Sequence, residues 1–113
     1  MFGWKIKEIV PTAQSNILEM LNALLNKIDF TLSNTTNDSI TILQREIQNC
    51  NSTILQLSNT EQSKVSMYWT SGVMGVINTL DMYNAIPSMK LTLVPSLLPA
   101  IRTNILNTIN ALS

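Results

Sequence analysis

Histidine is missing from this chain of 113 residues, and cysteine occurs only once. Without imidazole, the chain has no histidine ligands for a metal ion and no Ser-His or Cys-His nucleophile pair, which removes most common enzyme chemistries. The three glycines leave little material for a phosphate-cradling loop, and neither glycine-rich nucleotide motif occurs. We therefore predict no catalytic residues, no metal site and no cofactor.

Charged residues are scarce as well, at 12% of the chain, and seven basic side chains balance seven acidic ones. No run of like charge could neutralise a phosphate backbone, so nucleic-acid binding is disfavoured. A net charge near zero also removes the electrostatic repulsion that keeps copies of a protein apart. We therefore expect the partner to be a second copy of the chain, in a homo-oligomer, or another protein.

Long uninterrupted apolar runs are lacking too. Lys5, Lys7 and Glu8 fall where a signal peptide would have its apolar core, so we predict no secretion signal. The longest uncharged run, 16 residues between Lys64 and Asp81, is shorter than the roughly 20 apolar residues of a membrane-spanning helix. With one unpaired cysteine, these features predict a protein inside the cell or within an assembled particle.

Residues 1–11 form a separate N-terminal arm in this interpretation. Phe2, Trp4 and Ile6 alternate with less apolar residues, and Pro11 closes the segment. A short strand, an extended arm and a single helical turn all fit so brief a pattern. We expect the three apolar side chains to pack on the bundle or on another copy of the chain.

Residues 12–113 carry the patterns of one all-α domain, a small bundle of about four helices. We predict these helices at residues 12–33, 38–58, 60–86 and 96–112, because apolar residues recur there at helical spacing between polar turns and prolines. Asn37 or Asp38 is expected to cap the second helix, and Asn59 the third. Pro87 is expected to end the third helix, which leaves residues 88–95 as an irregular connector.

The second helix carries a regular apolar seam, with steps that alternate between three and four residues. Ile at each first position and Leu or Cys at each second is the pattern of a coiled coil. We favour an antiparallel pairing with the preceding helix and keep an intermolecular coiled coil as the alternative. The seam residues, which are also candidate contacts with a partner, are Ile40, Leu43, Ile47, Cys50, Ile54 and Leu57.

The third helix is apolar around most of its circumference, and we expect it to be the most buried of the set. Within it, Ser71, Gly72 and Gly75 are small residues at a spacing that lets two helices cross closely. Four methionines are expected to fill the core around this crossing, with an adaptable binding surface as the alternative. They are Met67, Met74, Met82 and Met89.

The predicted helices are amphipathic, and the sequence shows no catalytic or cofactor-binding motif. We therefore expect a non-enzymatic structural or self-assembly protein, such as a virion or filament subunit, that acts through helix packing. One alternative is a membrane-active protein, which the uncharged spans and small residues motivate. A second alternative is an adaptor or regulator that binds a partner helix in a methionine-lined groove.

Overall fold

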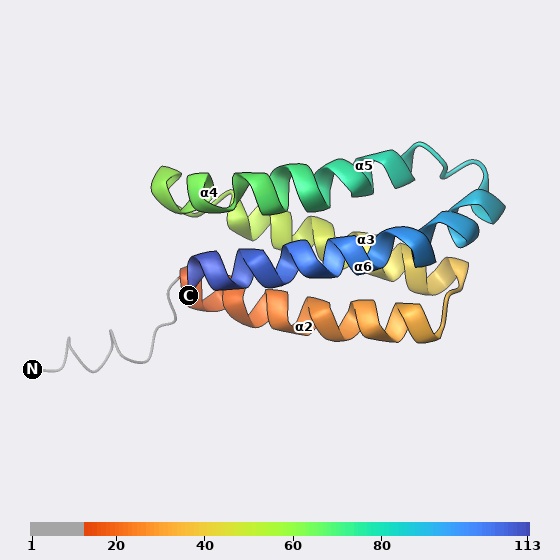
Figure 1. Ribbon diagram of the computed structural model, residues 1–113, viewed down its shortest axis with the longest axis horizontal. Coiled ribbons are helices and arrows are strands. Elements are labelled where there is room, and N and C mark those ends of the chain that lie inside the picture. Colours follow the sequence, from red (N-terminus) through yellow and green to blue (C-terminus); the bar gives the residue numbers. More distant parts are fainter. Residues whose placement is uncertain (1–12) are drawn as a thin grey trace, which may run out of the picture.

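Four helical rods, each antiparallel to the next, make up the part of the chain that the computed structural model describes, which is residues 13–113 with side chains from residue 16 onward (Figure 1). The first, second and fourth rods are α2 (Ala13–Ser33), α3 (Asn37–Ile54) and α6 (Pro87–Leu112). The third rod is continuous but changes type, from α4 (Asn59–Val65) through the π-helix η1 (Ser66–Met74) to α5 (Gly75–Asp81). Residues 13–113 contain no strand, and the prediction of an all-α bundle is confirmed.

The rods pack as an up-and-down bundle in which α6 is the most widely shared element. It contacts α2 on one side and all three parts of the third rod on the other, while α2 also packs on α3. Figure 1 shows α6 lying between α2 and the third rod, with α3 behind it. One end of the bundle therefore holds the α2–α3 turn and the α5–α6 connection, and the other holds the start of α2 and the end of α6.

The core is built from the inward faces of all four rods. In α2 the buried apolar residues are Ile17, Leu21, Leu24, Leu25 and Ile28, whereas Leu32 near its end is exposed. Burial of each such side chain is worth about 1.5–3 kcal/mol relative to exposure. All six seam residues are buried in this same core, five of them in α3 and Leu57 in the turn after it, because α3 ends at Ile54 rather than at residue 58. The partner of the seam is therefore the chain's own bundle.

Hydroxyl side chains start the second and third rods, each one residue before an expected cap. Thr36 caps α3, and its Oγ1 accepts from the Ser39 N–H at 3.0 Å while Ser39 Oγ accepts from the Thr36 N–H at 3.0 Å. The expected caps Asn37 and Asp38 are wrong because only Thr36 has Ser39 at the position that returns this bond. Ser58, not Asn59, caps α4 by accepting from the Glu61 N–H.

The first half of α6 corrects the expected connector at residues 88–95. Pro87 occupies the first turn, where its missing N–H costs nothing, and the helix then runs through Pro95 and Pro99. An interior proline costs about 3 kcal/mol. Both prolines are exposed, so water can satisfy the carbonyl groups that they leave unpaired, and the buried Val94 and Leu98 hold the opposite face on the core.

The third rod is less buried than its composition suggests. Met67 and Met82 are 74% and 80% exposed, and Met89 of α6 is also exposed, so of the four methionines only Met74 fills the core. The reason is the arrangement of the rods, because the third rod packs chiefly on α6 and leaves its outer side open. The rod also ends at Asp81 rather than at residue 86.

Candidate functional site

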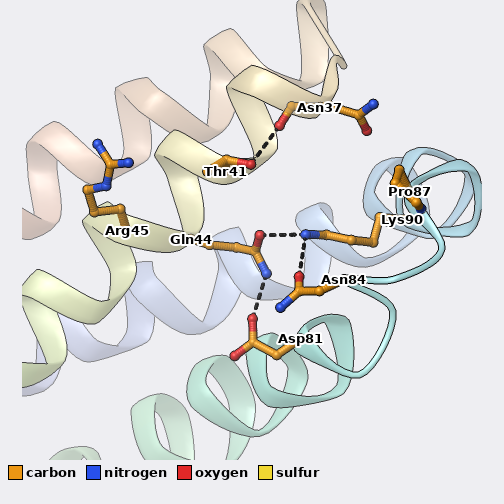
Figure 2. Close-up of a pocket in the computed structure, with 8 residues that line it drawn as sticks. All are labelled: Asn37, Thr41, Gln44, Arg45, Asp81, Asn84, Pro87 and Lys90. Carbon is orange, nitrogen blue, oxygen red and sulfur yellow. Dashed lines mark hydrogen bonds between the residues drawn. The ribbon is translucent and has the colours of Figure 1, made fainter.

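A polar pocket of about 510 Å³ opens at the end of the bundle where α3 and α6 both begin (Figure 2). Three elements line it: the first turns of α3, the end of α5 with the connection that follows it, and the first turn of α6. The lining residues are Asn37, Thr41, Gln44, Arg45, Asp81, Asn84, Pro87 and Lys90. Apart from Pro87, the lining side chains can all form hydrogen bonds, and they come from segments far apart in the sequence.

Lys90 is the centre of this pocket. It is only 8% exposed, which is rare for a lysine because moving an ammonium group out of water is costly. Its Nζ donates to Gln44 Oε1 at 2.8 Å and to Asn84 Oδ1 at 2.7 Å. Figure 2 shows the side chain reaching from α6 to the two amide groups. These bonds replace part of the hydration that Lys90 loses.

Gln44 joins Lys90 to the carboxylate of Asp81. While Gln44 Oε1 accepts from Lys90, its Nε2 donates to Asp81 Oδ1 at 2.7 Å. The amide thus lies between the two charges and orients toward both. Because Gln44, Asp81 and Lys90 come from α3, α5 and α6, the network fixes three rods relative to one another at this end.

The rim of the pocket adds further donors. Thr41 Oγ1 donates to the backbone carbonyl of Asn37, and the side chain of Asn37 extends to the side in Figure 2. Arg45 is exposed, and its guanidinium lies at the edge, away from Lys90. The lining offers amide, ammonium and guanidinium donors beside one carboxylate, and such an arrangement can bind a polar ligand. Nowhere in residues 13–113 do three His, Cys, Asp or Glu side chains gather as metal ligands would.

The candidate residues from the sequence lie elsewhere. Phe2, Trp4 and Ile6 fall outside the described residues. Ser71 and Gly75 are exposed on the third rod, so only Gly72 faces another helix. The seam side chains are enclosed in the core and leave no seam for a second copy in this fold: Ile40, Leu43, Ile47, Cys50, Ile54 and Leu57.

Gly72 lies at a close approach of η1 to α6. A Cβ atom added there would come within 2.5 Å of Asn104 Nδ2, and that same Nδ2 donates to the Gly72 carbonyl at 3.3 Å. In the same stretch, the fully buried Trp69 donates its Nε1–H to Asn51 Oδ1 of α3 at 3.0 Å. These two contacts attach the π-helical part of the third rod to both of its neighbours.

Cys50 is a packing residue in this structure. It is 2% exposed, and burial raises the pKa of its thiol to about 12, with the Glu46 carboxylate adding to the rise. A thiol with so high a pKa carries almost no thiolate at neutral pH, and thiolate is the reactive form. The side chain therefore acts as a small hydrophobe.

Sequence reasoning missed the Lys90 pocket, although one signal pointed to it. Lys90 is the single charged residue between Asp81 and Arg102, in a segment that is otherwise apolar or neutral. A lone charge in such surroundings indicates a side chain with a specific partner. Its partners Gln44, Asp81 and Asn84 could not be identified, because only the fold brings them together.

The remaining findings concern membrane crossing and similarity to known proteins. Among the described helices, none combines the length and the apolar character that crossing a membrane requires. Comparison of the chain with protein-family models, curated proteins and solved structures gave no match.

Proposed function

We propose that this chain is a non-enzymatic, self-assembling structural protein, such as a filament or virion subunit, whose copies associate end to end. The observation that carries the proposal is the gathering of exposed apolar side chains at one end of the bundle, opposite the end from which the apolar arm departs.

Nine large apolar side chains are exposed among the described residues, and six of them lie toward the end with the α2–α3 turn and the α5–α6 connection. A concentration of exposed apolar side chains at one end of a small protein favours interaction with another surface. With a net charge of zero, no long-range repulsion opposes contact between copies. The six side chains are Phe30, Leu32, Ile42, Met82, Ile86 and Met89.

The arm supplies the complementary apolar surface. It precedes Ala13, the first residue of α2, and so departs from the opposite end of the bundle. In the proposed assembly, its apolar side chains cover the exposed end of the next copy in a row.

An arm that docks on the far end of a neighbour forms a contact between two different surfaces. Contacts of this kind repeat from copy to copy, and they produce a ring when the rotation closes or an open filament when it does not. This geometry supports an assembled particle as the working form of the protein.

Light scattering of the full chain over a concentration series tests the proposal. We expect the average mass to rise with concentration, and to stay at the monomer value for a chain that lacks residues 1–11 and for the double variant Met82→Gln/Met89→Gln. An equimolar mixture of these two altered chains should form dimers that do not grow, since one still has the exposed end and the other still has the arm. Met67→Gln, an exposed methionine away from this end, is the matched control and should assemble normally.

Two outcomes would refute end-to-end assembly. A full chain that stays monomeric up to millimolar concentration contradicts self-association itself. A mixture of the two altered chains that stays monomeric, while the full chain assembles, contradicts the arm-to-end contact.

A further inference from the structure

We infer that the pocket around Lys90 binds an oxyanion, and that its ligand is the phosphate group of a small molecule. This inference stands on the pocket alone and does not depend on whether the chain assembles.

The first argument is that the buried Lys90 ammonium has no direct counter-charge. Among the residues that the structure describes, no carboxylate contacts this ammonium, and it donates to two neutral amide oxygens, on Gln44 and Asn84. Buried charges in proteins are ordinarily paired with an opposite charge. An ammonium group has three N–H donors, so one remains for a ligand in the pocket. An anion would supply the direct counter-charge that the fold omits.

The second argument is the balance of groups that line the pocket. Lys90 and Arg45 contribute two positive charges, and Asp81 contributes one negative charge whose Oδ1 already accepts from Gln44. Because Asn84 gives its Oδ1 to Lys90, its Nδ2 is left as a donor. The free capacity of the site is therefore mostly donor capacity with a net positive charge, which fits the acceptor oxygens of a phosphate group.

The third argument is the helix end at the pocket wall. Pro87 is the first residue of α6, whose 26 residues place the positive end of the helix dipole at the pocket. No acidic residue occupies the first turn of α6, although the Ile86 carbonyl accepts from the Met89 and Lys90 N–H groups. α3 also begins here, but Asp38 in its first turn already offsets its dipole. The α6 dipole, which no acidic side chain offsets, therefore adds to the attraction for an anion.

The size of the pocket selects a small ligand. About 510 Å³ falls within the 300–1,000 Å³ that is typical of small-molecule sites. The space exceeds that of a free phosphate ion and admits the organic part of a phosphate monoester, which the exposed Arg45 and Asn37 at the rim would face.

Isothermal titration calorimetry with inorganic phosphate as the probe tests this inference. The full chain is titrated at constant ionic strength, with sodium chloride replacing phosphate in the reference, because exposed charges respond to any salt. We expect saturable binding of phosphate and none of chloride. Arg45→Gln should weaken binding several-fold and, because Arg45 is exposed, should leave the fold intact.

Two further variants complete the experiment. Lys90→Met keeps the aliphatic stem but removes the charge, and it should abolish binding in a chain that circular dichroism shows to be folded. Arg102→Gln is the matched control, since Arg102 is a half-exposed arginine on another part of α6 and forms an ion pair with Asp29 of α2 at 2.9 Å. This variant should bind phosphate as the parent chain does. If Lys90→Met does not fold, the comparison of Arg45→Gln with Arg102→Gln decides.

The inference is overturned if the heat of phosphate addition equals that of chloride at the same ionic strength. It is equally overturned if a folded Lys90→Met chain binds phosphate with the same Kd as the parent chain, or, where Lys90→Met does not fold, if Arg45→Gln does, because binding would then occur elsewhere on the surface.

Discussion

Replacing Gly72 by alanine tests how closely the third rod approaches α6. Gly75 provides a matched comparison three residues along the same rod. Alanine in place of glycine stabilises a helix by about 1 kcal/mol where the added methyl group fits. At Gly75 the nearest atom to an added Cβ is the Thr70 carbonyl oxygen at 3.8 Å, an ordinary contact. We therefore expect Gly75→Ala to raise the free energy of unfolding by about 0.5–1 kcal/mol.

At Gly72 the same methyl group meets Asn104, with Nδ2 at 2.5 Å and Cγ at 2.6 Å. The asparagine must rotate away, which breaks its hydrogen bond to the Gly72 carbonyl at a cost of about 0.5–1.5 kcal/mol. A side chain forced off its preferred rotamer costs a further 0.5–1.5 kcal/mol or so. These terms cancel or exceed the gain from alanine, so we expect Gly72→Ala to be less stable than Gly75→Ala by about 2 kcal/mol.

Urea denaturation followed by circular dichroism measures this difference. All variants are compared at one protein concentration, because association would add to the apparent stability. A double-mutant cycle isolates the contact, since shortening the neighbour in Asn104→Ala makes room for the methyl group. In that background Gly72→Ala should no longer destabilise the protein. The reasoning fails if Gly72→Ala is as stable as Gly75→Ala in the parent chain, or if its penalty persists beside Ala at position 104.

Three other predictions concern single side chains. Because the folded-state pKa of Cys50 is raised to about 12, the free energy of unfolding should fall as pH rises above about 8.5, by up to about 1.4 kcal/mol per pH unit. Urea denaturation of the parent chain and of Cys50→Ala at pH 8 and pH 10 tests this, and an equal change of the free energy of unfolding with pH in both chains would contradict it. Thr36→Ala should lower the free energy of unfolding by about 1 kcal/mol through loss of the α3 cap, while Asn37→Ala should change it little. A larger loss of stability in Asn37→Ala than in Thr36→Ala, measured by urea denaturation, would show that Asn37 is the cap. Trp69→Phe should lower the free energy of unfolding by about 2 kcal/mol, because it removes the hydrogen bond to Asn51 and leaves a cavity. An unchanged melting temperature would contradict a stabilising role for this hydrogen bond and for the packing of the indole ring.

α3 shows which features of this fold the sequence could predict. Its seam alternates steps of three and four residues from Ile40 to Ile54 and continues to Leu57 in the turn beyond the helix, and that local periodicity suffices to identify the buried face. The predicted cap, Asn37 or Asp38, was wrong by one or two residues, because neighbouring polar side chains in the turn compete for the same role. Only the reciprocal bond from Ser39 decides in favour of Thr36.

The start of α6 shows where local rules fail. Prolines at positions 87 and 95 predict interruptions, and a short apolar stretch between them carries no clear helical period. Tertiary contacts override this tendency, since Lys90 is held by Gln44 of α3 and Val94 is buried in the core. The pocket could not be predicted for the same reason, because its residues are joined by contacts across 37 and 46 positions of the chain.

The π-helical stretch of the third rod has a consequence for insertions and deletions. Val65, Trp69, Val73 and Ile77 all face the core, at steps of four residues. In a uniform α-helix, with about 100° per residue, Val65 and Ile77 would point about a third of a turn apart. For this reason the sequence pattern predicted apolar residues around most of the helix. A π-helix holds more residues per turn than an α-helix, so the turns of η1 accommodate one additional residue and keep all four side chains on one side. Removal of one exposed residue, Thr70 or Ser71, should therefore leave a continuous α-helix whose Ile77 and Leu80 still reach the core. A length change that would ruin most buried helices should be tolerated at this point of the chain.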